Sequence, residues 1–513
     1  MTIMIRSDDF LETHAKSAAI VICSLAVLFY SLLVWAFPVV HWYDAHIRLA
    51  LRDRILLGHW LPLVQALTVL VSKFTHDLLV LRILLAVGAG CALFCMYVLA
   101  RHLFSSGTAL VAVALLAANM MFTALATVPY PEVLFVGLLL LTLYLLDAHP
   151  SGKHFLLGML TLNLACLTRY EGWLLAGIFV VHIARETLWT KNWKKLIRTA
   201  LLAGIAPLGW LMFGVSGSGS LLDRLKAVIA FEVMTDVEGI GGRFLSHLNW
   251  DYLRAFASNY WHLLNSQAGA GIVFLGAIGW LSAMFSPRHR AIHRLIFIFM
   301  ILDWLLLALW QPWDFTNLRT AFIGEAFLLL YAAHGLRRSI HFVFQRAAKN
   351  IFQTASLSGW ENRVVTFFTL LIAWDSASAA VGFVRTTSQE KDFANPAHVG
   401  NWLNKRLDVD DAVLSLTDDV FQPYALAAYT GFDYDAILDD RFDDREISDR
   451  LERAQAIYIV ESYRMRDGLS QKESNLLKTL EDGTVGAQSF TIGSTRVWLV
   501  QHTGINTLKA IYK

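Results

Sequence analysis

Hydrophobic residues form long, nearly uninterrupted runs along the first three quarters of the chain. Runs of about 20 apolar residues are typical of helices that cross a bilayer, and the shorter runs predict tilted or partial spans. The pattern predicts a polytopic α-helical membrane protein with about 11 transmembrane helices. The predicted spans are 17–40, 78–100, 108–128, 132–147, 155–169, 172–185, 199–215, 269–285, 293–310, 319–336 and 363–384.

The composition supports an integral membrane protein. Of the 513 residues, 56% are hydrophobic and 16% are charged, whereas soluble domains average about 25% charged residues. The net charge of +2 comes with no basic block interleaved with aromatic residues, so nothing indicates a nucleic-acid partner. The cysteines lie inside apolar runs, where small buried thiols are common, and their spacing predicts no disulfide framework and no CxxC metal site. They are Cys23, Cys91, Cys95 and Cys166.

Lysine and arginine residues concentrate in every second loop. This positive-inside pattern predicts a cytoplasmic N-terminus. Eleven spans then place the C-terminus and two long loops, 41–77 and 216–268, on the outer side. The second long loop contains Gly239, Gly241 and Gly242. It is either a lid that orders when a ligand binds or a plain structured loop.

Beyond the last apolar run the pattern changes to short alternating segments with many charges. Residues 396–407 predict a helix, and 412–416, 456–460 and 489–500 predict strands. These elements indicate a small C-terminal extracytoplasmic α/β domain of ordinary size. The predicted division is a transmembrane catalytic domain at 1–384 and an α/β domain at 385–513.

The stretch 41–62 directly follows the first span and is amphipathic. Ile47, Leu51 and Ile55 recur every four residues, which predicts a helix that lies on the membrane surface, with its arginines mostly on another face. Asp44 stands at the start of this helix and is the best candidate in the chain for chemistry. The alternative is that Asp44 only caps the helix and pairs with Arg48.

Further ionisable residues gather at the outer ends of the predicted spans, where charges are costly and usually functional. Some have structural alternatives: Arg169 with Glu171, and Arg319 with Asp314, are spaced to pair with each other, and Glu132 suits a helix N-terminus. Four histidines of the outer loops, His46, His59, His76 and His247, are too scattered to indicate a metal site. These outer candidates are Glu132, Arg169, Glu171, Asp314 and Arg319.

The layout resembles the GT-C glycosyltransferases, and most closely the bacterial relatives of protein O-mannosyltransferases and of the transferase that adds aminoarabinose to lipid A. The motifs that carry the resemblance are Asp44 with the amphipathic stretch to Pro62, the turn 168–172 (TRYEG), Pro131-Glu132, and Arg319. One departure is that Ala45 and His46 follow Asp44, where many members carry a second acid. A metal held by paired acids is therefore not supported.

The resemblance implies a polyprenyl-phosphate-linked sugar as donor and a lipid, glycan or protein as acceptor. The phosphate is already a good leaving group, so the site needs cations to hold it and a base to deprotonate the acceptor hydroxyl. Asp44 is the expected general base of an inverting transfer. The expected phosphate ligands are Arg169, Arg319 and Lys73, and the expected sugar or acceptor ligands are Glu132, Glu171, Asp314, Tyr130 and Trp313. The aromatic residues have the alternative of an interfacial belt.

Two other functions fit the same sequence. One is a transporter or flippase of a lipid-linked or polar substrate, which also needs intramembrane charges. The other is an oligosaccharyltransferase or ligase of the same architecture. The clustering of the charged candidates at outer span ends favours an enzyme, since a transporter needs a site near the midplane. A bacterial inner membrane is expected because the sequence shows no eukaryotic retention signal.

Overall fold

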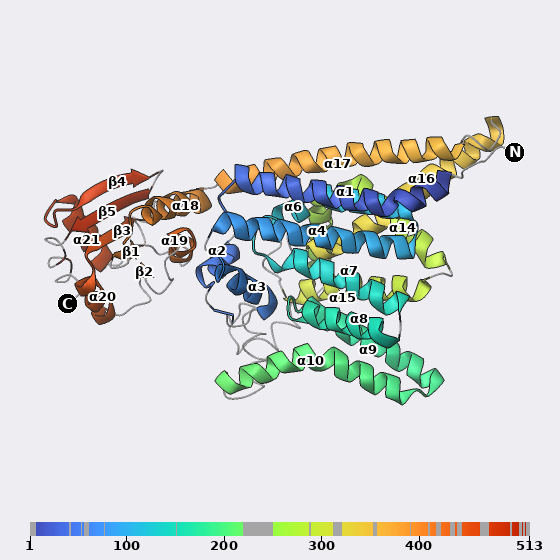
Figure 1. The fold of residues 1–513 in the computed structure, drawn as a ribbon, viewed down its shortest axis with the longest axis horizontal. Helices are drawn as coiled ribbons and strands as arrows, with labels where there is room; N and C mark the ends of the chain where they lie inside the picture. Colours follow the sequence, from blue (N-terminus) through green and yellow to red (C-terminus); the bar gives the residue numbers. More distant parts are fainter. Residues whose placement is uncertain are drawn as a thin grey trace. The chain divides into compact units, whose positions relative to one another are not determined.

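A computed structural model of the chain contains mainly helices, with one small sheet near the C-terminus (Figure 1). The structure describes the chain apart from residues 1–6, 41–42, 53, 56–60, 76, 150, 219–249, 287–288, 311–320, 352–356, 390, 409–410, 417–421, 431–436, 439–443, 462–470, 493–494, 502–504, 506–507 and 509–513.

The chain packs as two compact units that do not follow chain order. Unit 1 comprises Met1–Leu33, Leu56–Val64 and Ile83–Phe383, and unit 2 comprises Val34–Ile55, Gln65–Arg82 and Val384–Lys513. Unit 2 thus combines the C-terminal segment with most of the first predicted outer loop. The sequence-based division at residue 384 stays a prediction.

Unit 1 is a helical assembly, and each predicted span coincides with one helix or with a broken pair. Five of its described helices are long and apolar enough to cross a membrane, and the bent pair α13–α14 makes a sixth if it is one span. The total of about 11 stays a prediction. The helices are α1 (Ser7–Ala36), α4 (Leu78–Leu103), α5 (Ser106–Ala118), α6 (Met120–Leu125), α7 (Pro131–Ala148), α8 (Gly152–Cys166), α9 (Glu171–Thr190), α10 (Trp193–Ser218), α13 (Trp250–Ala268), α14 (Ala270–Phe285), α15 (Arg290–Trp310), α16 (Phe322–Ile351) and α17 (Leu357–Gln389).

The predicted span 108–128 is broken at Asn119 into α5 and α6. The backbone N–H of Asn119 donates to Leu116 O and ends α5, while its side-chain oxygen accepts the N–H of Phe122 at 2.9 Å and begins α6. Asparagine favours such caps because its short amide competes with helical backbone bonds. The break places a polar side chain deep in the unit, where Asn119 is 2% exposed.

Glycines let α14 and α16 pack with their backbones in direct contact. A Cβ atom on Gly279 would lie 1.8 Å from the carbonyl oxygen of Tyr331, and one on Gly335 would lie 2.0 Å from that of Leu275. No side chain fits at either position. Small residues are the usual means of close helix approach inside membranes, so this pair forms a rigid support for the polar residues on α16.

Unit 2 contains a five-stranded sheet of order β2-β1-β3-β5-β4. The inner strands β1 and β3 are parallel and almost fully buried, as expected for strands covered on both faces. The stretch predicted as strand at 489–500 is an antiparallel pair, β4 with β5. The elements are β1 (Ala412–Leu416), β2 (Ile437–Leu438), β3 (Ala456–Glu461), β4 (Gln488–Ile492), β5 (Thr495–Gln501), α18 (Lys391–Asn404), α19 (Gln422–Thr430), α20 (Asp444–Arg453) and α21 (Gln471–Glu481).

The predicted surface helix of the first loop is shorter and more buried than its pattern suggests. The structure has α2 (Tyr43–Ala50) and then, after a turn, α3 (Pro62–Ser72). Helix α2 packs on α19 within unit 2. Arg48 is 5% exposed rather than on an outward polar face, and Ile55, predicted on the apolar face, is 47% exposed. The four-residue period fails beyond Ala50 because the helix ends there.

Candidate active site

The first part of the candidate site is the N-terminus of α7. Pro131 occupies the first helical turn, where its missing N–H costs nothing and its fixed φ suits a helix. Glu132 follows in the same turn and is fully buried. A carboxylate at this position interacts favourably with the helix dipole, which is the structural alternative that the sequence left open for Glu132.

The second part is the TRYEG turn between α8 and α9. The Thr168 hydroxyl donates to Leu164 O at 2.7 Å, and the Trp173 indole N–H donates to Cys166 O at 2.9 Å. A Cβ atom on Gly172 would lie 2.7 Å from Ala165 C, so only glycine permits this close approach of the two helices. The turn therefore holds Arg169 in one place from both sides.

Arg169 joins the two parts. Its Nε donates to both carboxylate oxygens of Glu171, at 3.0 and 3.1 Å, and its terminal nitrogens donate to Glu171 and to Glu132. The side chains of Arg169, Glu132 and Glu171 are 19%, 0% and 13% exposed. The pairing of Arg169 with Glu171 that the sequence left open is thus present, and Glu132 joins the same group.

Two buried carboxyl groups that the sequence analysis did not single out lie in the same unit. Asp303 on α15 is 2% exposed and lies within electrostatic range of Glu171 and Arg169. Glu325 on α16 is fully buried and accepts a hydrogen bond from the Asn119 amide at 2.7 Å. The available signal was their position inside apolar runs, because ionisable residues at membrane depth are usually functional.

The group formed by Arg169, Glu132 and Glu171, with Asp303 within electrostatic range, is rich in acceptors. Among the described residues, one oxygen of each of Glu132, Asp303 and Glu325 is buried and has no hydrogen-bond partner. Buried oxygens of this kind favour a proton or an incoming hydroxyl donor. The arrangement therefore suits a ligand with many hydroxyl groups. A phosphate would have to take over Arg169 donors that Glu132 and Glu171 now occupy.

In unit 2, α2 carries Asp44 in its first turn, and the side chain of Asp44 lies outside the described residues. The next two residues are buried. Ala45 is fully buried, and His46 is 1% exposed with its ring centroid 5.8 Å from that of Tyr429. A second acid at position 45 would be buried, which explains the departure from the two-acid pattern in physical terms.

Electrostatics keep His46 neutral. Burial lowers the pKa of its imidazole to about 3, and the nearby Arg82 guanidinium adds to the effect. The Tyr429 hydroxyl accepts the backbone N–H of Val40 at 2.6 Å, and burial raises its pKa to about 12. Arg82 in turn donates to the carbonyls of Phe37 and Pro38, at 3.1 and 2.8 Å. This network holds the chain on both sides of α2.

The remaining predicted site residues are distributed as follows. Tyr130 is 4% exposed and immediately precedes α7. Lys73 is exposed just after the end of α3. The other three predicted site residues, Trp313, Asp314 and Arg319, lie outside the described residues. The glycines of the suggested lid also lie outside them.

Comparison with known proteins gives one family match and several similar folds. Residues 53–210 match the family model described as dolichyl-phosphate-mannose-protein mannosyltransferase. No curated protein sequence matches the chain.

Two groups of solved structures have a similar fold. ArnT from Cupriavidus metallidurans bound to undecaprenyl phosphate has a TM-score of 0.55 at 13% identity, over 94% of this chain and 98% of that chain. The Archaeoglobus fulgidus oligosaccharyltransferase has a TM-score of 0.54 at 15% identity in its apo form, over 87% of this chain and 70% of that chain. The same oligosaccharyltransferase tethered with an acceptor peptide has a TM-score of 0.54 at 14% identity, over 89% and 70%.

The matched segment 53–210 contains the N-terminus of α7 and the TRYEG turn, and so includes Glu132, Arg169 and Glu171. The fold, which combines apolar helices with a small C-terminal sheet, is that of ArnT and the oligosaccharyltransferase. The chain thus has helices long and apolar enough to cross a membrane, is similar over residues 53–210 to the dolichyl-phosphate-mannose-protein mannosyltransferases, and has the fold of ArnT and of the oligosaccharyltransferase.

Proposed function

We propose that the chain transfers a sugar from a polyprenyl-phosphate donor to an acceptor hydroxyl on the extracytoplasmic side of a membrane, with inversion at the anomeric carbon. The observation that carries the proposal is the buried group of Glu132, Arg169 and Glu171 at neighbouring helix ends, inside the segment that matches the mannosyltransferase family model. Support for the donor class comes from ArnT, a protein of similar fold that is bound to undecaprenyl phosphate.

Asp44 is the proposed general base. The leaving phosphate needs little acid assistance, so one carboxylate that accepts the acceptor proton is enough for a single displacement. The test is sugar transfer from a polyprenyl-phosphate sugar by the purified protein, with Asp44→Asn as variant. Loss of transfer with unchanged folding and donor binding is expected. Full activity of Asp44→Asn would remove Asp44 from this role.

A capping aspartate in the same loop provides the matched control. The Asp77 carboxylate accepts the N–H of Leu79 at 2.8 Å at the start of α4. Asparagine also caps helices well, so Asp77→Asn should leave transfer unchanged. If Asp44→Asn behaves like Asp77→Asn, Asp44 is a cap and not a base.

Arg169 is the proposed contact for the donor phosphate, together with Arg319 and Lys73. Glu171 is the more exposed of its two partners, so we propose that phosphate displaces Glu171 from one edge of the guanidinium while Glu132 keeps the other. Arg169→Lys retains the charge but not the forked geometry. Arg169→Lys should raise the KM for the donor clearly while lowering the Tm only slightly. A fall in stability alone would show that Arg169 is only structural.

The sugar and acceptor are proposed to contact Glu132, Glu171, Tyr130, Asp314 and Trp313. Polar acceptor groups at this density favour hydrogen bonds to several hydroxyls. NMR of the product gives the anomeric configuration, and mass spectrometry of envelope glycans with and without the protein gives the sugar. Retention of configuration would contradict a single displacement by one base.

A second candidate function is oligosaccharyl transfer, favoured by the fold similarity to the archaeal oligosaccharyltransferase. The mass added to the acceptor separates the two. A single-sugar increment supports monosaccharide transfer, and an increment of several sugars supports the second function.

The membrane sidedness is part of the proposal. The cationic loops predict a cytoplasmic N-terminus and an extracytoplasmic C-terminal domain in a bacterial inner membrane. Labelling of a single cysteine introduced at exposed His398 by a membrane-impermeant reagent in intact spheroplasts tests it. Labelling only after lysis would reverse the orientation.

A further inference from the structure

Three ionisable side chains from α4, from α7 and from the residue before α15 meet at the end of α7 that lies opposite Glu132. Asp147 precedes the last residue of α7, His102 lies in the last turn of α4, and His289 immediately precedes α15. Residues 132 and 147 are about 22 Å apart along α7, at 1.5 Å of rise per residue. The group is therefore separate from the Arg169 cluster, and nothing in the proposed glycosyl transfer uses it.

The geometry of this group is compact. His102 Nε2 and His289 Nδ1 each lie 2.8 Å from the same oxygen of Asp147, Oδ2. One donor atom from each of the three residues lies within 4.8 Å of the other two. The side chains of His102, Asp147 and His289 are 20%, 21% and 12% exposed, so the group lies at a partly shielded but accessible position.

The backbone at His289 is held in an uncommon conformation. Its φ is 61°, in the left-handed region that L-residues with a side chain rarely adopt. Strained positions of this kind persist where the surroundings over-determine them, and they cluster at functional sites. In this case the strain directs a ring nitrogen of His289 at the Asp147 carboxylate.

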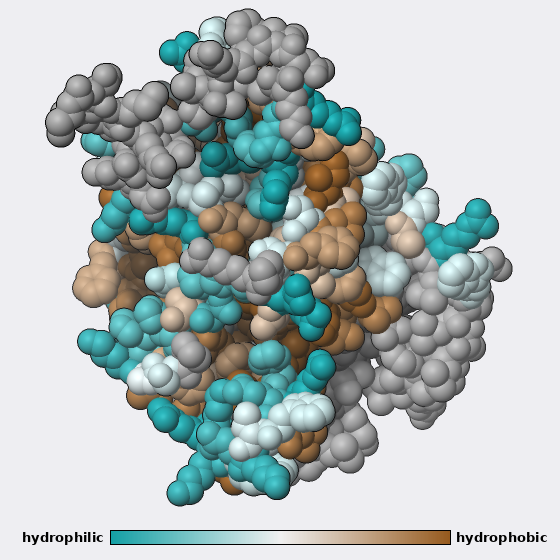
Figure 2. All heavy atoms as spheres, turned by 90° about the vertical axis from the view of Figure 1, so that its right-hand side faces the viewer, coloured by the Kyte–Doolittle hydropathy of each residue, from teal (hydrophilic) through white to brown (hydrophobic). Residues whose placement is uncertain are grey.

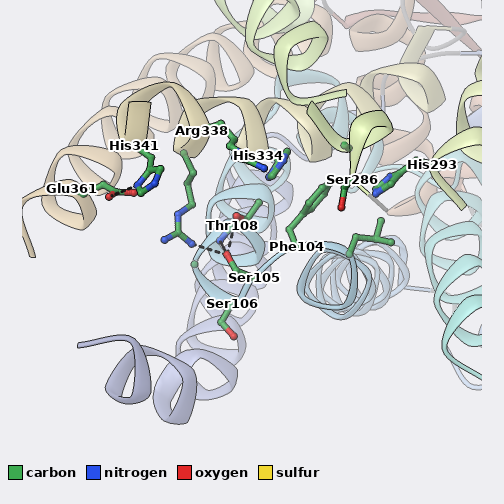
Figure 3. Close-up of a pocket in the computed structure, with 14 residues that line it drawn as sticks. Phe104, Ser105, Ser106, Thr108, Ser286, His293, His334, Arg338, His341 and Glu361 are labelled. Carbon is green, nitrogen blue, oxygen red and sulfur yellow. Dashed lines mark hydrogen bonds and ion pairs between the residues drawn. The ribbon is translucent and has the colours of Figure 1, made fainter. Parts of the chain in front are cut away.

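A pocket adjoins this end of the unit. It has a volume of about 590 Å³ and is lined by His293, His334 and Arg338 among others (Figure 3). His293 lies one helical turn beyond His289, within electrostatic range of His289 and Asp147. Hydrophilic side chains also spread over the face shown in Figure 2. The partial exposure of His102, Asp147 and His289 leaves the group within reach of ions in solution.

We propose that His102, Asp147 and His289 bind a divalent transition metal of the zinc class. Two imidazole nitrogens and one carboxylate oxygen are a ligand set that Zn²⁺ accepts, with bonds of about 2.0–2.2 Å and the fourth tetrahedral position left for water. Tetrahedral ligand atoms at such bond lengths lie about 3.3 Å apart. The present 2.8 Å separations are shorter than this, so the Asp147 carboxylate would move outward, while the two imidazole nitrogens lie within 4.8 Å of each other.

The metal joins the C-terminal ends of α4 and α7 to the start of α15. Each imidazole would bind through an unprotonated ring nitrogen, and any proton that stood between that nitrogen and Asp147 would be released to solvent. The alternative is that Asp147 only bridges two imidazoles by hydrogen bonds. That alternative predicts the same contacts without metal affinity, so metal binding distinguishes the two.

The test is a titration of the full-length protein, purified in detergent and stripped with a chelator, with Zn²⁺ followed by calorimetry. One ion per chain is expected, and at least a tenfold loss of affinity in Asp147→Asn and in His289→Gly. Glycine adopts φ 61° without strain, so His289→Gly removes a ligand without a backbone penalty. Size-exclusion chromatography of each variant checks the fold.

A second histidine pair provides the control. The rings of His149 and His154 are 4.4 Å apart, the same centroid separation as His102 and His289. Within the described residues, no third ligand completes a metal-binding group around His149 and His154. His154→Ala should leave the stoichiometry and affinity unchanged.

X-ray absorption at the zinc edge provides a readout that does not depend on the variants. Nitrogen and oxygen ligands at about 2.0 Å are expected. The proposal is overturned by a wild-type protein that binds no zinc, by variants that bind as well as the wild type, or by a sulfur ligand in the absorption spectrum.

Discussion

The two ends of α7 carry one carboxylate each, and their partners differ in kind. At the start of the helix, the fully buried Glu132 is paired with Arg169, whose guanidinium is charged at every physiological pH. At the far end, the partly exposed Asp147 meets two histidines, whose charge is set by protons or a metal. The first end thus holds a permanent cation, Arg169, whereas the charge at the second end is adjustable.

Removal of the guanidinium gives the largest expected effect. Arg169→Ala leaves Glu132 and Glu171 without their cation, and breaking a buried ion pair on one side typically costs about 3–5 kcal/mol. Thermal unfolding in detergent should show a drop of several degrees in Tm together with loss of transfer. The exposed Lys153 gives the control, since Lys153→Ala removes a cation that has no buried partner among the residues the structure describes. Equal Tm values for the two variants would contradict a strong buried pair.

The second-largest expected effect is a rise in Tm on zinc binding, which depends only on the group at the Asp147 end of α7. A ligand at 100 times its Kd stabilises the folded state by about 2.7 kcal/mol. Added Zn²⁺ should therefore raise the Tm of the wild type and of Arg169→Lys, and a chelator should reverse the rise. Asp147→Asn should not respond. A zinc-induced rise that persists in Asp147→Asn would place the metal elsewhere.

A smaller effect is expected where a neutral amide holds a buried carboxyl. Asn119→Ala leaves Glu325 without the amide that donates to it, which typically costs about 1–3 kcal/mol, and also removes the cap of α6. Asn119→Ser keeps a cap but loses the amide donor, so its Tm should lie between those of the wild type and Asn119→Ala. If Asn119→Ser equals the wild type, the bond to Glu325 contributes nothing to stability.

The sequence predicted the parts of this comparison that depend on local pattern. Apolar runs identified the helices, and the Pro131-Glu132 and TRYEG motifs identified the residues that meet at Arg169. The motifs did not indicate that Glu132 and Glu171 would hold the same guanidinium, because that contact joins α7 to the α8–α9 turn across 37 residues.

Other features followed from tertiary packing that no local pattern contains. The amphipathic period of the first loop predicted a surface helix, yet α2 is covered by α19, almost 400 residues away in the sequence. The sequence analysis did not single out His102 or His289 as metal ligands. His102 and His289 come together only because the ends of α4 and α7 and the start of α15 lie close in space. The available signal was Asp147, an acid at the end of the predicted span 132–147.

His46 gives a third kind of histidine environment and the smallest expected effect. Its charged neighbour is the Arg82 guanidinium, and its pKa is lowered to about 3 from about 6.5 in an unfolded chain. Between these values the unfolded state binds more protons than the folded state, so stability is full above pH 6.5 and falls as the pH drops toward 3. From pH 7 to pH 6 the free energy of unfolding falls by about 0.7 kcal/mol, with a limiting slope of about 1.4 kcal/mol per pH unit.

The variant His46→Gln should lack this loss, so its Tm should fall less than that of the wild type between pH 7 and pH 6. The variant His398→Gln, on the exposed surface, should follow the wild type. Parallel pH profiles for the wild type and His46→Gln would mean that His46 is not the neutral buried group that its environment indicates.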